Sequence, residues 1–426
     1  MEAIERGARA ATDAPATHAA TPVGPWARWA RRFVHRYLER LTRGSVSLHE
    51  PGSTRATFGD PTADLSATLT VHDPRFFWRT VAGGDIGFAE SYMDGDWDCD
   101  DLTTLIGIFA INREELDDLS LATALPRRVL SRAYHWTRRN TLAGNRRNIQ
   151  DHYDLGNEFF RLFLDPTMTY SCAVFPCGTE TLEQGQRLKI DAVLKKAAIR
   201  PDDHVLEIGS GWGSLAIAAA RRTGCRVTTL TLSDEQKRWV ERLVAAEGLE
   251  ERVDVRIADY RTIRGTFDRI VSIEMLEAVG HENLPVYFSA CDRLLTARGR
   301  AVIQVITIRD ERYDEYRRGC DFIQRHIFPG GHLPSWGALE AAISSTSRLR
   351  IENVEDIGHH YPATLRAWRG ALEENAEHAR ELGFDDTFLR KWNYYFSYCE
   401  AGFRTRMLGD LQLVLAKNDT PETQER

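Results

Sequence analysis

The stretch that decides the fold is HVLEIGSGWGSLA (204–216), in which an apolar run meets three closely spaced glycines and a second apolar run follows. The run before the glycines has the length and composition of a buried strand, and the run after them has the apolar spacing of a helix. Gly209, Gly211 and Gly213 let the backbone turn sharply and approach a ligand beside the positive end of that helix. We therefore expect a strand, a ligand-binding loop and a helix in this order.

Regular alternation of strand and helix continues on the C-terminal side of this unit. The segments that read as strands are CRVTTLTLS (225–233), VDVRIADY (253–260), DRIVSIEML (268–276) and GRAVIQVITI (299–308). Helical spacing marks two segments between them, DEQKRWVERLVAAEG (234–248) and GHENLPVYFSACDRLL (280–295). Such alternation predicts an α/β domain with a doubly wound, mainly parallel sheet. The chain from 362 to 417 reads as helical additions that are rich in aromatic residues.

The region before this domain divides by composition. Residues 1–22 are rich in Ala, Thr and Pro and lack the apolar stretch of a signal peptide, so we expect a flexible leader. Over 23–125, a basic aromatic helix that begins WARWARRF (26–33), alternating segments between 45 and 73 and a later apolar helix predict a smaller α+β domain. The acidic stretch DGDWDCDD (94–101) lacks the spacing of an EF-hand, so we interpret it as a solvated loop that caps the next helix and predict no metal site.

A basic segment, PRRVLSRAYHWTRRNTLAGNRR (126–147), lies between the two domains and carries seven Arg among Tyr, His and Trp. Two interpretations of it stay open. The segment is either a solvent-exposed linker, or an interfacial segment whose arginines meet anionic lipid head groups while its aromatic rings lie at head-group depth.

Composition argues against several classes of protein. The formal net charge of −7 disfavours a general nucleic-acid binder, which needs a basic surface to neutralise phosphates. The seven cysteines form no CxxC pair, which disfavours a disulfide scaffold or a zinc site and favours a reducing cytoplasm. No apolar run approaches the roughly 18–20 residues that span a bilayer.

The glycine loop narrows the choice of cofactor. A dinucleotide fingerprint needs glycine at its sixth position, and Ser214 stands there. Glu207, two residues before the first glycine, completes a pattern that resembles the S-adenosylmethionine loop of class I methyltransferases. The second strand departs from that pattern, because TTLTLS (228–233) ends without an acidic residue at the usual ribose position.

Seven stretches together carry a more specific resemblance. They are IQDHYDLGNEFFRLFLDPTMTYSCAVF (149–175), LEQGQRLKIDAVL (182–194), VLEIGSGWGSLA (205–216), TLTLSDEQ (229–236), IVSIEMLEAVG (270–280), FIQRHIFPGGHLPS (322–335) and HHYPATLRAW (359–368). From about 149 to 415 the chain resembles the cyclopropane-fatty-acyl-phospholipid synthases, a family that includes mycolic acid cyclopropane synthases and related lipid methyltransferases. The resemblance implies an S-adenosylmethionine-dependent catalytic domain over 148–418. A weaker similarity of the N-terminal region implies that the domain over 23–125 is lipid-associated.

The resemblance also implies which residues contact S-adenosylmethionine. They are Tyr170, Ser171, Gly209, Gly211, Thr231, Gln236 and Tyr260. In this family the pattern TLTLSxxQ replaces the missing acidic residue, which accounts for the neutral end of the second strand.

A bicarbonate ion beside the transferred methyl group is a second cofactor that the resemblance implies. Backbone at Cys172 and Ile306 would hold this ion, together with the side chains of Glu277 and Tyr361. The family's histidine is missing, because the aligned position is Gln304. A glutamine amide donates a hydrogen bond but carries no positive charge and relays no proton, so either bicarbonate binds with altered affinity or another base replaces it.

The stretch VSIEMLEAVGHENL (271–284) holds the candidate catalytic carboxylate. By the same resemblance we expect Glu277 to be the working group, and we interpret Glu274 and Glu282 as solvated or structural. His281 reads as part of the first turn of a helix rather than as a catalytic residue.

The implied reaction is methyl transfer from S-adenosylmethionine to the cis double bond of an unsaturated acyl chain in membrane phospholipid. Aromatic faces, with Phe159, Phe160, Tyr170 and Tyr361 as candidates, would stabilise the resulting carbocation by cation–π contact. For the two phenylalanines, core packing is the alternative role. Loss of a proton from the new methyl group closes a cyclopropane, which is the product we expect. Loss from a neighbouring carbon instead gives a methylene branch, which a partner reductase could saturate.

Two other functions stay open on this fold. A small-molecule N- or O-methyltransferase would need no interfacial segment, and a catalytically dead lipid- or cofactor-binding module would need broken cofactor or carboxylate positions. The lipid methyltransferase hypothesis further implies a cytoplasmic enzyme that associates peripherally with the inner face of the membrane, with a homodimer as a candidate assembly.

Overall fold

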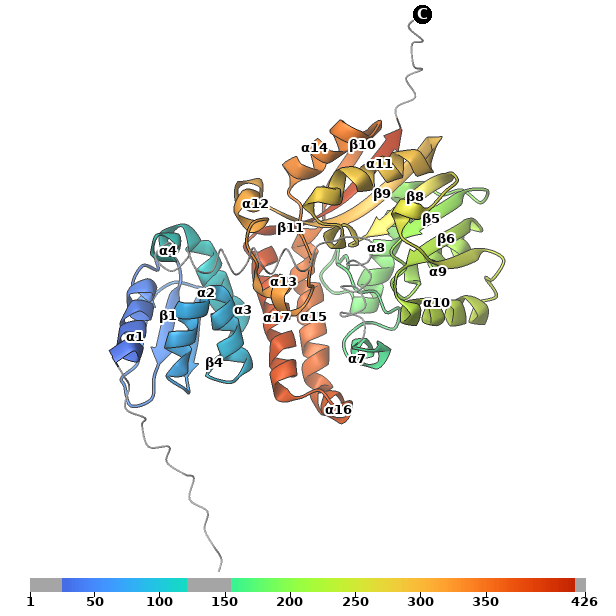
Figure 1. The fold of residues 1–426 in the computed structure, drawn as a ribbon. Helices are drawn as coiled ribbons and strands as arrows, with labels where there is room; N and C mark the ends of the chain where they lie inside the picture. The colour runs from blue at the N-terminus through green and yellow to red at the C-terminus, as the bar shows by residue number, and fades with distance from the viewer. Residues whose placement is uncertain (1–24, 121–154, 418–426) are drawn as a thin grey trace, which may run out of the picture.

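The computed structural model describes residues 25–120 and 155–417, and a seven-stranded sheet dominates the larger part (Figure 1). Its strands, in spatial order, are β10 Leu349–Asp356, β11 Leu408–Lys417, β9 Leu295–Ile308, β8 Phe267–Ile273, β5 His204–Ile208, β6 Arg226–Thr231 and β7 Val253–Ile257. β5 to β9 pair in parallel, and β11 is antiparallel to both of its neighbours. The predicted doubly wound, mainly parallel sheet is confirmed.

One C-terminal prediction is wrong. The segment read as helical through residue 417 forms α15 Tyr361–Glu374, α16 Ala376–Glu381 and α17 Asp386–Arg404, but it then ends in strand β11. Leu413 and Leu415 of β11 belong to the core on one face of the sheet, and Val414 belongs to the core on the other face. This segment forms a strand because it lies between β9 and β10 and buries successive residues on opposite faces of the sheet. Its position between those strands depends on residues far away in the sequence.

Helices cover both faces of the large sheet. α8 Leu182–Ala197, α9 Ser214–Thr223 and α10 Asp234–Ala246 share one core, whereas α11 Leu284–Leu294 and α14 Trp336–Thr346 share the other. Successive residues of a strand point into different cores. In β5, for example, Val205 is fully buried in the first core and Leu206 is fully buried in the second. Burial on both faces explains why these strands appear in the sequence as near-continuous apolar runs.

The N-terminal domain contains the predicted mixture of helices and strands. Its four-stranded sheet has the order β2 Ala56–Gly59, β1 Ser45–His49, β3 Ser66–Val71 and β4 Trp97–Cys99. Its helices are α1 Pro25–Leu38, α2 Arg75–Met93, α3 Leu102–Ile111 and α4 Arg113–Ser120.

The acidic stretch 94–101 is more ordered than the predicted solvated loop. Asp101 does cap α3, as expected, by accepting a hydrogen bond from the backbone of Thr104 (2.9 Å). Asp96, however, is buried and accepts hydrogen bonds from Arg75 and Arg79 (both 3.0 Å), and strand β4 follows it directly. A buried carboxylate of this kind needs its two guanidinium partners.

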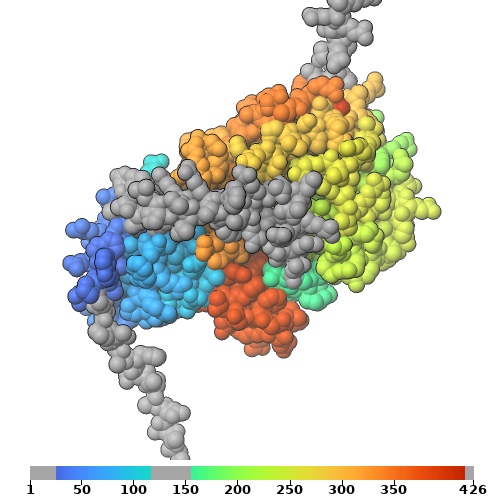
Figure 2. All heavy atoms as spheres, in the orientation of Figure 1, coloured from blue at the N-terminus to red at the C-terminus, as the bar shows by residue number. Residues whose placement is uncertain are grey.

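Helix α17 joins the two parts of the molecule. It packs on α15 on one side and on α2 and α3 on the other. Arg390 of α17 donates to the backbone carbonyls of Tyr92 (2.6 Å) and Trp97 (2.8 Å), and buried aromatic side chains from both parts form one continuous core. The N-terminal domain therefore abuts the C-terminal helices, as the space-filling view also shows (Figure 2).

Two predicted segments, the leader over 1–22 and the basic segment over 126–147, lie outside the described residues. Within 25–120 and 155–417, no helix is both long and apolar enough to cross a bilayer.

Candidate active site

The glycine loop follows β5 at the carboxyl edge of the sheet, where sheets of this type bind their ligands. Gly209, Gly211 and Gly213 adopt positive φ angles of +98°, +49° and +90°. A Cβ added at Gly209 would lie 3.1 Å from the side chain of Met275, and one at Gly213 would lie 2.9 Å from Val240. The loop therefore needs glycine for its conformation and for close packing, and it lines a large cavity.

Strand β6 ends in a neutral hydrogen-bonded pair. Thr231 Oγ1 donates to Gln236 Oε1 (2.7 Å), and both side chains are buried at the cavity wall. Tyr260 lines the same cavity, and burial raises its pKa. The Tyr260 hydroxyl has no hydrogen-bond partner within the described ranges. Because an unpaired buried hydroxyl costs free energy, Tyr260 is suited to bond a ligand.

Tyr170 and Ser171 reach the cavity from the loop that precedes α8. The Tyr170 hydroxyl shares a hydrogen bond with the hydroxyl of Tyr395 (3.0 Å), and Ser171 Oγ accepts one from Lys189 Nζ (2.6 Å). Lys189 is buried, and burial lowers its pKa. Sequence reasoning missed Lys189, although its place on the buried stripe of α8 was a usable signal, since lysines are rarely buried without polar partners.

Glu274, interpreted from the sequence as solvated or structural, is held in place by several hydrogen bonds. Its carboxylate lies at the cavity and accepts hydrogen bonds from the Cys172 backbone N–H (2.8 Å), Gln304 Nε2 (2.8 Å) and the Tyr361 hydroxyl (2.7 Å). Glu274 directly follows β8 and has a φ of +46°, which is uncommon for a residue other than glycine. Such strain is often found at functional sites, where the surrounding contacts hold it in place.

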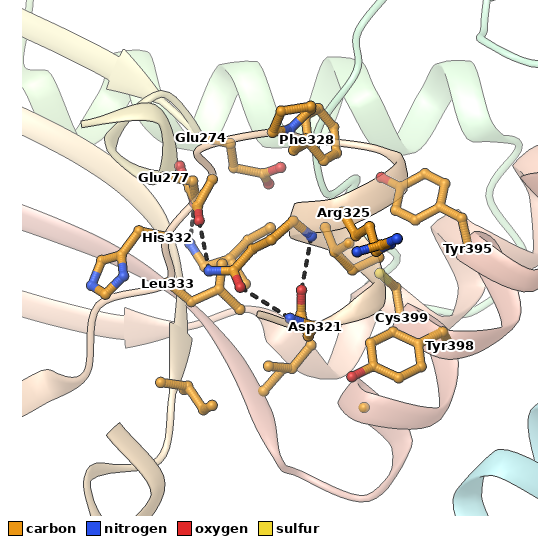
Figure 3. Close-up of a pocket in the computed structure, with 18 of the residues that line it drawn as sticks. Glu274, Glu277, Asp321, Arg325, Phe328, His332, Leu333, Tyr395, Tyr398 and Cys399 are labelled. Atoms are coloured by element: carbon orange, nitrogen blue, oxygen red, sulfur yellow. Dashed lines mark hydrogen bonds between the residues drawn. The ribbon is translucent and has the colours of Figure 1, made fainter. Parts of the chain in front are cut away.

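Glu277 faces the same cavity from the turn η3 Leu276–Ala278 (Figure 3). Its Oε1 accepts a hydrogen bond from the backbone N–H of Ile306 (2.5 Å), and its Oε2 has no hydrogen-bond partner in the described part of the chain. Burial, and then the charge of Glu274, raise the pKa of Glu277 to about 8. Glu277 is therefore mostly protonated at neutral pH.

The five residues implied for a bicarbonate site lie close together, but the hydrogen-bond donors among them bond to glutamate side chains of the protein itself. The donors are Cys172, Gln304 and Tyr361 toward Glu274, and Ile306 toward Glu277. A bicarbonate ion would need the same donors, which the carboxyl groups of Glu274 and Glu277 already occupy. The donor set therefore does not fit bicarbonate.

Two aromatic candidates lie away from the cavity. Phe159 and Phe160 are fully buried in the aromatic core, where both pack against Trp392 with ring centroids 4.8 and 6.2 Å apart. Neither lines the cavity, so both take the alternative role of core packing, whereas Tyr170 and Tyr361 do line the cavity.

The other polar residues of the stretch 271–284 keep the structural roles expected of them. His281 lies in the turn η4 His281–Asn283, where its Nδ1 is 2.7 Å from the hydroxyl of Tyr313. Glu282 is exposed to solvent. Neither residue lines the cavity.

One cavity of about 1720 Å³ connects these groups. Its polar end holds the glycine loop and the two glutamates. Tyr395 and Tyr398 of α17 line its middle, opposite those glutamates (Figure 3). Its apolar end lies in the N-terminal domain, where Phe33 of α1, Phe88 of α2 and Phe109 of α3 line it. Both domains therefore build the space for a substrate.

A family model and three known proteins resemble this chain. The model, described as mycolic acid cyclopropane synthetase, matches residues 140–413. Tuberculostearic acid methyltransferase UfaA1 of Mycobacterium tuberculosis is 38% identical over 428 residues, covering 95% of each chain. The cyclopropane-fatty-acyl-phospholipid synthase of Escherichia coli K12 is 33% identical over 362 residues, covering 82% of this chain and 88% of that protein. The structure of mycolic acid cyclopropane synthase CmaA1 complexed with SAH and CTAB has a TM-score of 0.60 at 34% identity, covering 64% of this chain and 98% of that one.

Proposed function

We propose a reaction for this chain, which belongs to the mycolic acid cyclopropane synthetase family and is an S-adenosylmethionine-dependent methyltransferase with the class I fold. The family, fold class, enzyme class and S-adenosylmethionine cofactor predicted from the sequence are confirmed. The proposed reaction is methyl transfer to the cis double bond of an unsaturated acyl chain in membrane phospholipid.

The observation that carries this proposal is the continuity of the cavity from the glycine loop into the apolar interior of the N-terminal domain. Sites for small molecules usually occupy about 300–1,000 Å³. The cavity here is about 1720 Å³, so it has room for a long apolar substrate in addition to the cofactor. A small-molecule N- or O-methyltransferase would have no use for the apolar end.

The polar end fits S-adenosylmethionine. The residues that would hold it are Gly209, Gly211, Thr231, Gln236, Tyr260, Tyr170 and Ser171. When bound, S-adenosylmethionine supplies a methyl group that is electrophilic because it is attached to a sulfonium. The glycine loop allows close backbone approach, and the unpaired hydroxyl of Tyr260 offers a hydrogen bond.

The mainly apolar lining of the cavity would hold the double bond beside the methyl group and limit its contact with water. The two π electrons of the double bond form the new carbon–carbon bond as the methyl–sulfur bond breaks, which leaves a positive charge on the neighbouring carbon. The faces of Tyr170 and Tyr361 border the cavity and would stabilise that cation.

Glu274 is the proposed base. Its carboxylate is fixed by three hydrogen bonds, so it can accept the proton that the carbocation must lose. The electrons of the broken carbon–hydrogen bond then neutralise the cation. This assignment gives the chain a base of its own, without bicarbonate.

Two products share this carbocation, a cyclopropane and a methylene branch. The relative that matches 95% of the chain, N-terminal domain included, is named a methyltransferase of tuberculostearic acid, and its name mentions no ring. We therefore take the methylene branch as the expected product and the cyclopropane, favoured by the sequence alone, as the alternative. A reductase that saturates the branch, and a homodimer, stay predictions.

Peripheral association with the membrane is also proposed, and helix α1 supports it. α1 contains no acidic residue, and Trp26 and Trp29 on its surface are 76% and 45% exposed. Exposed arginines at positions 28, 32 and 36 flank these rings. Basic helices that carry exposed tryptophan bind to anionic lipid surfaces. Phe33 of α1, whose ring lies 5.7 Å from that of Trp29, lines the cavity next to these tryptophans.

The test is to incubate the full chain with S-adenosylmethionine and vesicles of oleoyl phospholipid, and to measure the acyl chains by mass spectrometry. We expect a gain of one CH2 per modified chain. Proton NMR of the product distinguishes vinylidene protons of a methylene branch from upfield protons of a ring. No mass gain, with cofactor binding intact by calorimetry, would refute the proposal.

A further inference from the structure

Gln304 links the Glu274 carboxylate to a second, deeper carboxyl group on β11. Its Nε2 donates to Glu274 Oε1 (2.8 Å) and also to Asp410 Oδ2 (2.9 Å). Asp410 is fully buried, and its other oxygen, Oδ1, has no hydrogen-bond partner within 25–120 and 155–417. Sequence reasoning did not single out Asp410, and no step of the proposed reaction uses it so far.

The orientation of the Gln304 amide is fixed from the side of β11. Lys196 Nζ can only donate, and it donates to Gln412 Oε1. Gln412 therefore turns its Nε2 toward Gln304 Oε1 (3.0 Å), across the β9–β11 ladder in which these two residues pair. With its oxygen occupied in this way, Gln304 presents both of its N–H groups to Glu274 and Asp410.

Two ionised carboxylates that share one neutral amide in an enclosed space repel each other. Gln304 gives each of them a hydrogen bond but no positive charge. A single proton held within the pair removes the repulsion. Asp410 Oδ1, which has no hydrogen-bond partner among the described residues, can carry that proton. Burial, followed by the charges of Glu274 and Glu277, raises the pKa of Asp410 well above its usual range.

Titratable groups face Asp410 from several elements. They are Glu274 after β8, Glu277 in η3, Lys189 on α8, Cys172 in the loop before α8, Tyr361 at the start of α15 and Asp356 on β10. Lys189 favours an ionised Asp410, and the two glutamates oppose it. More carboxyl groups than lysines face Asp410. The favoured charge state is therefore one in which Glu274 and Asp410 together hold one proton.

We propose that Asp410 is a positioning residue that holds one proton within the unit Glu274–Gln304–Asp410, behind the Glu274 carboxylate that faces the acyl chain. The inference rests on the proposed function and deepens it. In the reaction Glu274 accepts the proton that the carbocation loses, while Asp410 keeps its own proton and acts through Gln304 without touching the substrate.

The pH dependence of turnover tests this role. Asp410 loses its proton as pH rises through its raised pKa, which leaves two ionised carboxylates, so wild-type turnover should decline on the alkaline side. Asp410→Asn places a neutral hydrogen-bonding group of the same size there. This variant should retain turnover at neutral pH and lose the alkaline decline.

Asp356→Asn is the matched control. Asp356 Oδ1 accepts a hydrogen bond from the backbone N–H of Asp410 (3.1 Å), so this substitution removes a nearby carboxylate outside the proposed unit, and the alkaline decline should persist. An Asp410→Asn variant with an unchanged alkaline decline would overturn the inference. An equal loss of turnover at every pH would also overturn it, because that is the signature of a purely structural role.

A second measurement on the wild-type chain does not depend on how the variant folds. With carbon-13 in the aspartate carboxyl groups, NMR should show one aspartate still protonated at neutral pH, and a chain in which every aspartate is ionised contradicts the inference. Failure of the proposed function has a different signature. The wild-type chain would then add no CH2 to oleoyl phospholipid, whatever the aspartate titration shows.

Discussion

The two ends of the cavity are built in different ways. At the polar end, the glycine loop and Glu274 follow directly after β5 and β8, at the carboxyl edge of one rigid sheet. At the apolar end, aromatic side chains from three helices of the N-terminal domain line the space. On the proposed function, this difference places the chemistry and the contact with lipid in separate domains. Substitutions at one end should then leave the property of the other end intact.

The largest expected effect is at the polar end. Glu274→Gln keeps the size of the side chain but removes the proposed base, so turnover should fall by about 10²- to 10⁴-fold. Cofactor affinity and vesicle binding should not change. Product formation is measured by mass spectrometry. The control is Glu282→Gln, which neutralises an exposed carboxylate eight residues after Glu274 and should leave turnover unchanged. Full activity of Glu274→Gln would end the assignment.

A smaller effect is expected from Gly209→Ala. The new Cβ would lie 3.1 Å from Met275 at a backbone φ of +98°, so the loop must shift, and such strain costs about 1–3 kcal/mol. Affinity for S-adenosylhomocysteine, measured by calorimetry, should fall by roughly tenfold or more. Gly224→Ala is the control, because its φ is also positive (+74°) but nothing lies within 4 Å of the added Cβ. Equal losses of affinity in both variants would contradict the role of the loop.

At the other end, the double variant Trp26→Ala with Trp29→Ala should weaken binding to anionic vesicles by roughly tenfold, because two exposed rings no longer enter the lipid surface. Cosedimentation with vesicles measures this effect, and cofactor affinity should stay unchanged. Val286→Ala on α11, where the side chain is 44% exposed, is the matched control. If cofactor affinity fell together with vesicle binding, the separation of the two ends would be wrong.

The smallest effect concerns stability. The folded-state pKa of Glu277 is raised from 4.5 to about 8, so the folded state binds more protons than the unfolded state between these values. Its contribution is present at low pH and is lost as pH rises toward about 8. Glu277→Gln should therefore lose less stability than the wild type between pH 5 and 8, by on the order of 2 kcal/mol, in denaturant titrations. Parallel stability curves would show that Glu277 is ionised throughout.

Local features of the sequence were enough to predict the cofactor end. Gly209 and Gly211 act through backbone conformations that only glycine adopts readily. Such features depend on neighbours within a few residues. For this reason the loop and the parallel sheet were predictable before the fold was known, whereas Thr231, at the end of β6, and Gln236, in the first turn of α10, were predicted from the family resemblance.

The choice between Glu274 and Glu277 was not predictable in this way. The two residues are three positions apart in one stretch, and the sequence favoured Glu277. Only the folded chain brings the Cys172 N–H, Gln304 and Tyr361 to Glu274, from segments 102, 30 and 87 residues away. The positive φ of Glu274 that turns it toward them has no marker in the sequence, because it is held by those distant contacts.

The sequence by itself therefore determined the doubly wound sheet and the cofactor loop, because these depend on local periodicity and on glycine geometry, and the resemblance of its matched stretches indicated the family. The tertiary structure gathered the three donors around Glu274, excluded Phe159 and Phe160 from the cavity and placed the buried Asp410 behind Gln304. In the folded chain the last segment, predicted to be helical, ends in strand β11, which carries Asp410. Burial and hydrogen bonding between residues far apart in the chain control these outcomes, and a single sequence does not record them.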